Sequence, residues 1–524
     1  MNRFADDPSG PSASPPTPGY GLNEAASRDG DHGSSARIDA VSPKGEGRGA
    51  IPEETRSSTP PHRRLPPRPA RLDGAQGPLA CGERGRAGRR LVRKFAGDGL
   101  VRRFVVMLGG EVVQSAFHFG LNVALVRMLS QHDYGVFAII FLVGGIGLPY
   151  VRALAGVPAA TFVPGRHGRR TARAYEVTFG SGALVVSGLL GLGVALAVLI
   201  VPQMPAQVPA WAAGLFVAAW CLRSYLRLAL FAKRRPVESG LGDLAFALSG
   251  TLLALLLTRG EGLAQLEGVF AALALAHAIG IATVLLLLRE PVRIDLGPHA
   301  RRRYGALRDK LGWSLVGVTT TNLQGQGQTL LVALLAGPEA YAPIAAVLIL
   351  FAPLRLPAAA LVNMVQPEIA GHLARRAAAP AKRLVRLASG LILFGCLLYG
   401  ALLALVHGAI DAQLFAGRFA DAPLALITLL LWAVSTLSLT YAPARVFLEA
   451  AQDFRFLAVL SAGSAVAGCA GVAALLLIAT PAWSILGLLL SELIVFAACF
   501  GAAARAGVQA RPLGSPPFAE RGIA

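Results

Sequence analysis

Residues 123–138 of the chain read VALVRMLSQHDYGVFA, a short polar turn set between two long apolar stretches. Each flanking stretch is long enough for a helix that crosses a bilayer, which needs about 17–25 residues. The stretch before the turn carries a stripe of polar side chains, and the stretch after it is more uniformly apolar. The pattern predicts a membrane-embedded helical hairpin between Val105 and Gly156.

The composition of the whole chain agrees with this hairpin. Of 524 residues, 54% are hydrophobic and 15% are charged, whereas soluble domains contain about 25% charged residues. The formal net charge of +19 does not indicate a nucleic-acid partner, because the basic residues lie between apolar segments. The five cysteines are widely spaced, which indicates neither a disulfide framework nor a metal site. The composition predicts a polytopic membrane protein.

Twelve apolar segments follow Val101, each long enough to span a bilayer. Their approximate limits are 104–126, 134–157, 175–201, 210–231, 239–258, 266–288, 311–335, 341–366, 384–408, 422–446, 455–478 and 482–504.

The loops between these segments alternate in charge. One set is basic, with seven arginines and lysines between Arg289 and Lys310 alone, whereas the opposite set holds only Arg127, Arg259 and Arg418. By the positive-inside rule, the basic loops and both termini are expected in the cytoplasm. The alternation supports an even number of spans, because the loss of one span would put the later basic loops on the wrong side.

The long basic loop divides the chain into two halves. We expect a disordered cytoplasmic tail at 1–95, because its Pro, Gly, Ser and Arg cannot form an apolar core. The expected order is then an N-terminal six-helix lobe at 100–288, a basic cytoplasmic linker at 289–310, a C-terminal six-helix lobe at 311–505 and a cytoplasmic tail at 506–524. Residues 335–341, LAGPEAY, parallel the turn LSQHDY at 129–134.

Polar residues occupy matched positions in the first and seventh segments. Glu111, Ser115, His118 and Asn122 share one helical face with Gln114 beside it, and the same offset reaches Gln324 and Gln328, close to Asn322. Polar groups inside a membrane should face a protein interior or a wet cavity. The density of Thr, Asn and Gln over 319–328 favours a cavity wall, and hydrogen bonding between helices is the alternative. The glycines of this run permit a bend.

Four arginines lie inside apolar segments: Arg152, Arg223, Arg227 and Arg355. A lipid-facing arginine at the membrane centre costs about 2.5–3.5 kcal/mol, so these side chains should line a cavity. Their planar guanidinium groups suit phosphate, to which they can donate two hydrogen bonds. The alternative is structural ion pairing with Glu111, Glu176, Asp243, Glu449 or Glu492.

The hairpin at 123–138 resembles the turn between the first and second helices of oligosaccharide flippases, in the multidrug/oligosaccharidyl-lipid/polysaccharide exporter superfamily. Span count, charge alternation and the two halves extend the resemblance over about 100–505. It implies an all-α membrane protein with twelve transmembrane helices in two six-helix lobes around a central cationic cavity. It also implies that an undecaprenyl-pyrophosphate-linked oligosaccharide is moved across the bacterial inner membrane for surface polysaccharide biosynthesis, by alternating access.

The resemblance gives the polar residues expected roles. The arginines Arg152, Arg223, Arg227 and Arg355 would attract the pyrophosphate, and Gln114, Asn122, Asn322, Gln324 and Gln328 would bind sugar hydroxyls. Glu111 and His118 are candidates for proton coupling, with a structural role for His118 or coupling to sodium as the alternatives, and no other cofactor is expected. The expected partners are the lipid-linked oligosaccharide, membrane lipids, and a polysaccharide polymerase with its chain-length machinery.

Three alternatives compete with the flippase interpretation. A drug or cation antiporter of the same superfamily should have an acidic cavity, whereas arginine predominates within these spans. A membrane polymerase or ligase would need a large extracytoplasmic loop with catalytic groups, but the longest such loop, 409–421, has only three charged residues. A structural scaffold would leave the matched stripes unexplained. We therefore expect a transporter and not an enzyme.

Overall fold

A computed structural model describes residues 100–163, 169–201, 208–233, 235–259, 266–288 and 293–505. Within these ranges the secondary structure is entirely helical. All of these residues belong to one compact unit, 80–524. The tails expected at 1–95 and 506–524 lie outside the described residues.

Among the described residues, the N-terminal half forms six long helical passes. The first is α2 (Leu100–Met128), and the second runs through α3 (Gln131–Val151), the π-helix η1 (Arg152–Gly156) and α4 (Val157–Phe162). The others are α5 (Arg169–Ile200), α6 (Ala210–Ala232), α7 (Pro236–Arg259) and α8 (Leu266–Leu288). A short helix, α9 (Pro298–Gly305), follows in the linker.

The C-terminal half contains six more. The seventh pass comprises α10 (Arg308–Asn322), the π-helix η3 (Leu323–Gly327) and the start of α11 (Gln328–Leu350). The rest of α11 and α12 (Ala352–Ala374) make the eighth. The remaining passes are α13 (Ala378–Ala409) with η4 (Ile410–Leu414), α14 (Leu424–Ala450), α15 (Phe454–Ile478), and η5 (Pro481–Ser484) with α16 (Ile485–Arg505).

The expectation of twelve crossings is confirmed. Ten helical stretches of the described residues are long and apolar enough to span a membrane. One of them, Leu311–Leu350, contains two helices joined at Gly337, and its second helix continues as α12. The 29-residue α2 supplies the remaining crossing. Several helices extend beyond the predicted spans because hydropathy marks only the apolar part of a helix.

The two matched turns are built differently. In the first, the Ser130 side chain caps α3 by accepting a hydrogen bond from the Asp133 amide at 3.0 Å, and its hydroxyl donates to the Asp133 carboxylate at 2.7 Å. In the second, Gly337 has a φ of 85°, which a residue without a side chain adopts readily. Proline follows at 338 and starts the next helix. Both predicted hairpins are therefore present.

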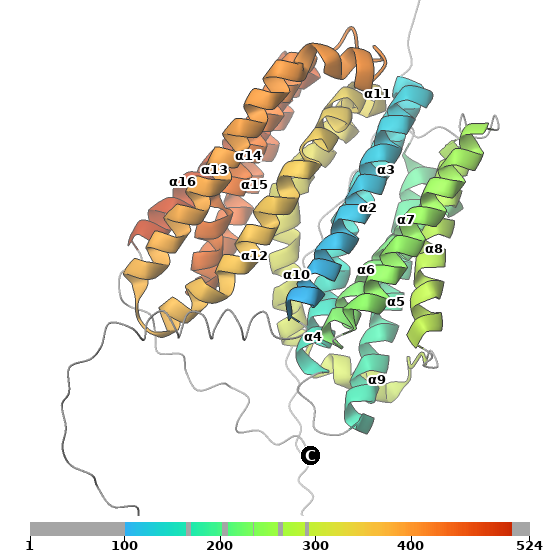
Figure 1. The fold of residues 1–524 in the computed structure, drawn as a ribbon, viewed down its shortest axis with the longest axis vertical. Helices are drawn as coiled ribbons and strands as arrows, with labels where there is room; N and C mark the ends of the chain where they lie inside the picture. The colour runs from blue at the N-terminus through green and yellow to red at the C-terminus, as the bar shows by residue number, and fades with distance from the viewer. Residues whose placement is uncertain are drawn as a thin grey trace, which may run out of the picture. The chain divides into compact units, whose positions relative to one another are not determined.

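The helices pack in two groups, which Figure 1 shows on either side of α10 and α11. In one group α2 packs on α7, and α8 packs on both α6 and α7. In the other, α14 packs on α13 and α16, and α15 packs on α16. Helix α3 joins the groups because it packs on α11 as well as on α6.

The joint between the halves includes both turns. The side-chain amide of Gln131 donates to the Glu339 carbonyl at 2.9 Å. Gly135 packs so closely on Pro338 that a Cβ atom would lie 1.9 Å from the Pro338 carbonyl oxygen. Tyr134 and Tyr341, the residues aligned from the sequence, are 1% and 2% exposed. The parallel turns of the sequence thus meet in space.

Candidate functional site

The polar stripe of α2 faces the interior of the N-terminal half. Gln114 accepts a hydrogen bond from Arg223 of α6 at 2.8 Å, and Glu111 pairs with Arg227 of α6 at 2.8 Å. The opposite face of α2 is exposed, at positions 109, 112, 116 and 120. The first-helix stripe is therefore turned toward its own helix group.

Arg223 is the centre of a buried polar cluster that four helices build. Its side chain is 6% exposed and donates to Asp243 of α7 at 2.6 Å and to His277 Nδ1 of α8 at 3.0 Å. Its guanidinium carbon lies 4.0 Å from the centre of the Phe246 ring. Burying a charge this deeply requires a partner of opposite charge, and Asp243 supplies it.

Arg227 extends this cluster toward the surface of the bundle. It lies 3.2 Å from the second carboxylate oxygen of Asp243, and it also pairs with Glu111, whose side chain is 42% exposed. Two arginines and two carboxylates therefore balance in charge. In this conformation Arg223 and Arg227 form structural ion pairs. Binding of the substrate by these two arginines stays a prediction.

His118 lies beside this cluster in an aromatic shell. Its ring centre is 5.3 Å from that of Phe141, 5.6 Å from Phe246 and 5.8 Å from Trp220. Neither of its ring nitrogens hydrogen-bonds a described residue, and the same holds for Nε2 of His277. The structure thus brings Glu111, Gln114 and His118 to one cluster, although the predicted ion coupling is untested.

The C-terminal half has a buried cluster of a different kind. The Gln324 amide donates to the Glu492 carboxylate of α16 at 2.8 Å and lies 3.4 Å from the Tyr441 hydroxyl of α14. Gln328, 1% exposed, donates to the carbonyl of Gln324 at 3.1 Å. Both glutamines are therefore buried and hydrogen-bonded in this conformation.

The two asparagines of the predicted site donate hydrogen bonds to backbone carbonyl groups. Asn122 donates to the carbonyl of His118 in its own helix at 2.7 Å. Asn322 donates to the Ile146 carbonyl of α3 at 3.0 Å, which links the two halves of the chain. Nearby, the Tyr150 hydroxyl lies 3.2 Å from Thr319 Oγ1. Asn322 belongs to the joint between the halves, and Asn122 belongs to the N-terminal half.

Arg152 and Arg355 stand apart from both clusters. Both side chains are exposed, and neither forms a salt bridge with a described residue. Arg152 lies in η1, a π-helix of the kind often found at functional sites, three residues after Pro149. The glycine run in which the sequence permits a bend contains η3 (Leu323–Gly327).

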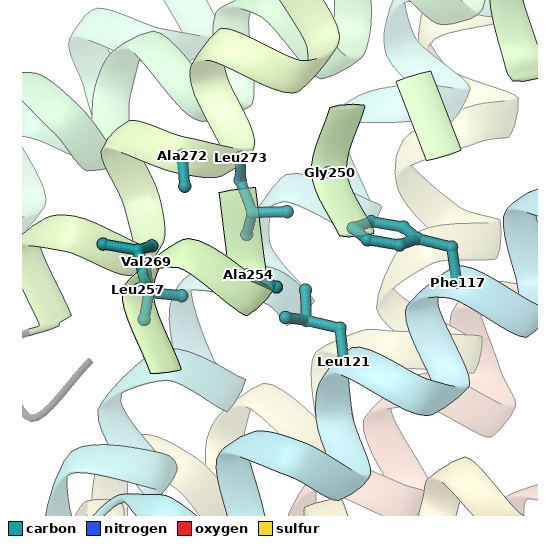
Figure 2. Close-up of a pocket in the computed structure, with 8 residues that line it drawn as sticks. All are labelled: Phe117, Leu121, Gly250, Ala254, Leu257, Val269, Ala272 and Leu273. Carbon is teal, nitrogen blue, oxygen red and sulfur yellow. The ribbon is translucent and has the colours of Figure 1, made fainter. Parts of the chain in front are cut away.

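Two cavities of the N-terminal half are apolar and contain none of the predicted site residues. One lies among α2, α7 and α8 (Figure 2) and has a volume of about 10 Å³, roughly the space of one water. The other, about 270 Å³, lies between α2 and α7. The residues of the first are Phe117, Leu121, Gly250, Ala254, Leu257, Val269, Ala272 and Leu273.

Sequence reasoning considered Asp243 and Glu492 only as partners of arginine and passed over His277. Each occupies an apolar span as an isolated polar residue, which is the signal that identifies it. Asp243 is 2% exposed, Glu492 6% and His277 0%. Glu492 connects α16 directly to the polar stripe of the seventh pass. Asp243 and His277 connect α7 and α8 to Arg223 of α6, which in turn bonds Gln114 in the stripe of the first pass.

Comparison with known proteins identifies the fold. No protein-family model and no curated protein matches the chain. Among solved structures, an inward-facing multidrug resistance MATE family transporter of the MOP superfamily is similar, with a TM-score of 0.58 and 12% identity over 76% of this chain and 98% of that one. An outward-facing structure of a transporter of the same description has a TM-score of 0.50 and 14% identity, over 78% and 94%.

The chain therefore has the fold of these MATE family transporters. The fold expected from the first hairpin is confirmed. The narrower resemblance to oligosaccharide flippases stays a prediction.

Proposed function

We propose that the protein moves an undecaprenyl-pyrophosphate-linked oligosaccharide from the cytoplasmic to the periplasmic leaflet of the bacterial inner membrane. Transport requires no covalent step. The prenyl chain stays in lipid, and the phosphate and sugar groups pass between the two helix groups.

The proposal rests on one observation. Two arginines deep within the described passes are exposed, whereas Asp243 and Glu492 are buried and the exposed Glu368 lies only six residues from the end of α12. Arg152 lies about 15 Å along its helix from Phe162, and Arg355 lies at least about 25 Å from either end of the eighth pass. Both are exposed, whereas Asp243 and Glu492 are buried and Glu111 is paired with Arg227. Free guanidinium groups at this depth favour an anionic substrate such as pyrophosphate.

A drug antiporter is the second candidate, because the similar structures are described as multidrug resistance transporters. A cationic drug would need an accessible carboxylate, and Glu111 is the partly exposed one of the N-terminal cluster. In either case we propose that Glu111 and His118 take part in proton coupling. Protonation of Glu111 would release Arg227 to Asp243 alone, which changes how α2 is held to α6.

The proposal also implies a membrane topology and a set of partner proteins. The basic loops and both termini would face the cytoplasm, and a polysaccharide polymerase with its chain-length machinery would use the product on the periplasmic side. The protein would act as a transporter and not as an enzyme. A reporter fused near Arg302 would be active in the cytoplasm if this topology holds.

Transport of lipid-linked oligosaccharide by reconstituted protein tests the function directly. Arg152→Gln and Arg355→Gln should each reduce transport about tenfold or more, because each removes a charge-assisted hydrogen bond. Arg455→Gln, which removes an exposed arginine at the start of α15, is the matched control and should transport normally. Protein that extrudes cationic drugs and moves no lipid-linked oligosaccharide would refute the proposal.

A further inference from the structure

The linker between the two halves is attached along α5. The Asp295 amide donates to the Ser181 hydroxyl at 2.8 Å, and Arg303 donates to Thr178 Oγ1 at 3.0 Å and to the Ala174 carbonyl at 3.3 Å. The Tyr304 ring meets Phe179 edge-on at 5.7 Å. The chain from Asp295 to Tyr304 therefore follows the first part of α5.

Tyr304 fixes this arrangement by entering a space that only glycine leaves open. A Cβ atom on Gly182 would lie 1.8 Å from the Tyr304 hydroxyl oxygen. Burial raises the pKa of the Tyr304 phenol to about 12, so the ring stays neutral in its site. The linker is thus docked on the N-terminal half.

The length of α5 gives the depth of the linker in the membrane. Its 32 residues span about 48 Å, whereas the hydrocarbon core is about 30 Å thick. Large apolar side chains become exposed on α5 at Leu184 and continue to Ile200, which marks the lipid-facing part. Ser181 lies just before this part, and Ala174 lies about two turns before Ser181. The linker therefore lies at the level of the lipid headgroups.

The linker exposes two kinds of side chain at this level. Ile294 and Leu296 are 58% and 51% exposed, next to the end that is bound to Ser181. Arg301 and Arg302 are exposed on α9. The Arg301 side chain reaches back along the linker, where its Nε donates to the Leu296 carbonyl at 3.1 Å. Exposed apolar side chains and exposed guanidinium groups thus lie close together on the linker. Arg293 and His299 are also exposed.

We propose that the linker, residues 293–305, is a docking surface for anionic phospholipid headgroups of the membrane leaflet on the basic side of the protein. Arg301 and Arg302 contact the phosphates while Ile294 and Leu296 enter the acyl boundary. The charge favours anionic over zwitterionic lipid, and the two exposed apolar side chains favour a bilayer surface over a soluble anion. The site does not depend on which substrate the protein carries.

This docking gives the linker a role in transport. The linker moves with α5, and the chain leaves it between Gly305 and Arg308, where α10 begins. Headgroups bound at Arg301 and Arg302 would hold the N-terminal half against the membrane surface. Motion between the halves would then be taken up at residues 305–308 and at the joint of α3 with α11.

Lipid binding by full-length protein in detergent tests the surface. We would titrate with phosphatidylglycerol or phosphatidylcholine and follow bound lipid by native mass spectrometry. The Arg301→Gln/Arg302→Gln variant should bind phosphatidylglycerol at least about tenfold more weakly, since each basic residue near an anionic surface contributes about a fivefold factor. Arg301→Lys/Arg302→Lys keeps the charge and should retain most of the binding.

A matched pair of arginines separates docking from general basicity. Arg383→Gln/Arg386→Gln removes the same charge from exposed positions of α13 on the same side and should change binding less than twofold. Equal losses in the two double variants would overturn the proposal, because the linker would then be one basic loop among several. Equal binding of the two lipids by the native chain would also overturn it.

A third experiment tests the contribution of the apolar side chains to lipid binding. Ile294→Ser/Leu296→Ser should weaken phosphatidylglycerol binding several-fold while the arginines remain. Glycerol 3-phosphate at millimolar concentration should not displace the lipid. If it does, the site recognises a free phosphate and the membrane-surface proposal is wrong.

Discussion

The two halves of the chain share a helical plan and differ in how each one buries a carboxylate. In the N-terminal half, Asp243 lies between the guanidinium groups of Arg223 and Arg227, at 2.6 and 3.2 Å. In the C-terminal half, Glu492 accepts a hydrogen bond from the Gln324 amide at 2.8 Å and is close to the Tyr441 hydroxyl. One acid is held by opposite charges, and the other is held by neutral donors.

This difference indicates which kind of interaction stabilises the buried cluster of each half. A buried ion pair is expensive to break because removal of one partner leaves an uncompensated charge. When a carboxylate is bound only by neutral donors, its replacement by an amide leaves no unpaired charge behind. The N-terminal cluster should therefore depend on charge, and the C-terminal cluster on shape and hydrogen bonding.

Asp243→Asn is expected to give the largest effect. The change keeps the shape of the side chain and leaves both arginines without their shared anion, so the free energy of unfolding should fall by about 3–5 kcal/mol. Thermal melting in detergent measures the loss. A double variant, Arg223→Met/Asp243→Leu, removes one charge of each sign and should be more stable than Asp243→Asn. The comparison fails if the single variant melts at the native temperature.

How much of this could be read from the sequence differs between the fold and the site. Hydropathy predicts the crossings because a bilayer demands about 20 apolar residues for each. Helical periodicity correctly puts Glu111, Gln114 and His118 on one face. It does not say whether that face meets α6 and α7 or the other half of the chain, since both would satisfy polar groups.

The sequence could not show which arginines are paired with acidic residues, for a related reason. Arg223 and Asp243 are 20 residues apart, on neighbouring helices, and their contact depends on the rotation of α6 against α7. Arg152 looks equivalent in the sequence but is exposed. The depth of a charge in a span can be counted, whereas its neighbours depend on packing.

Gly468→Ala tests the packing of the C-terminal cluster and should have an intermediate effect. A Cβ atom on Gly468 would lie 2.4 Å from the Gln328 side chain, which is 1% exposed and cannot move into solvent. Overpacking of this kind costs about 1–3 kcal/mol. Gly463→Ala on the same helix, where a Cβ atom would meet nothing within 4 Å, is the control in the same melting assay. Equal stability of the two variants would show that Gln328 has room to move.

Glu492→Gln completes the comparison and should have the smallest effect. The new amide keeps an oxygen that can accept from Gln324, and the cluster loses a charge that no described salt bridge balances. The free energy of unfolding should therefore change by less than about 1 kcal/mol, within the range of one exchanged hydrogen bond. Melting of Glu492→Gln beside Asp243→Asn gives the result in one experiment, because the chemical change is the same in both halves. A loss as large as that of Asp243→Asn would mean that Arg445, which now bonds Thr321 at 3.2 Å and Glu449 at 3.4 Å, compensates Glu492 as a counter-charge. The two halves would then bury their acids by the same means.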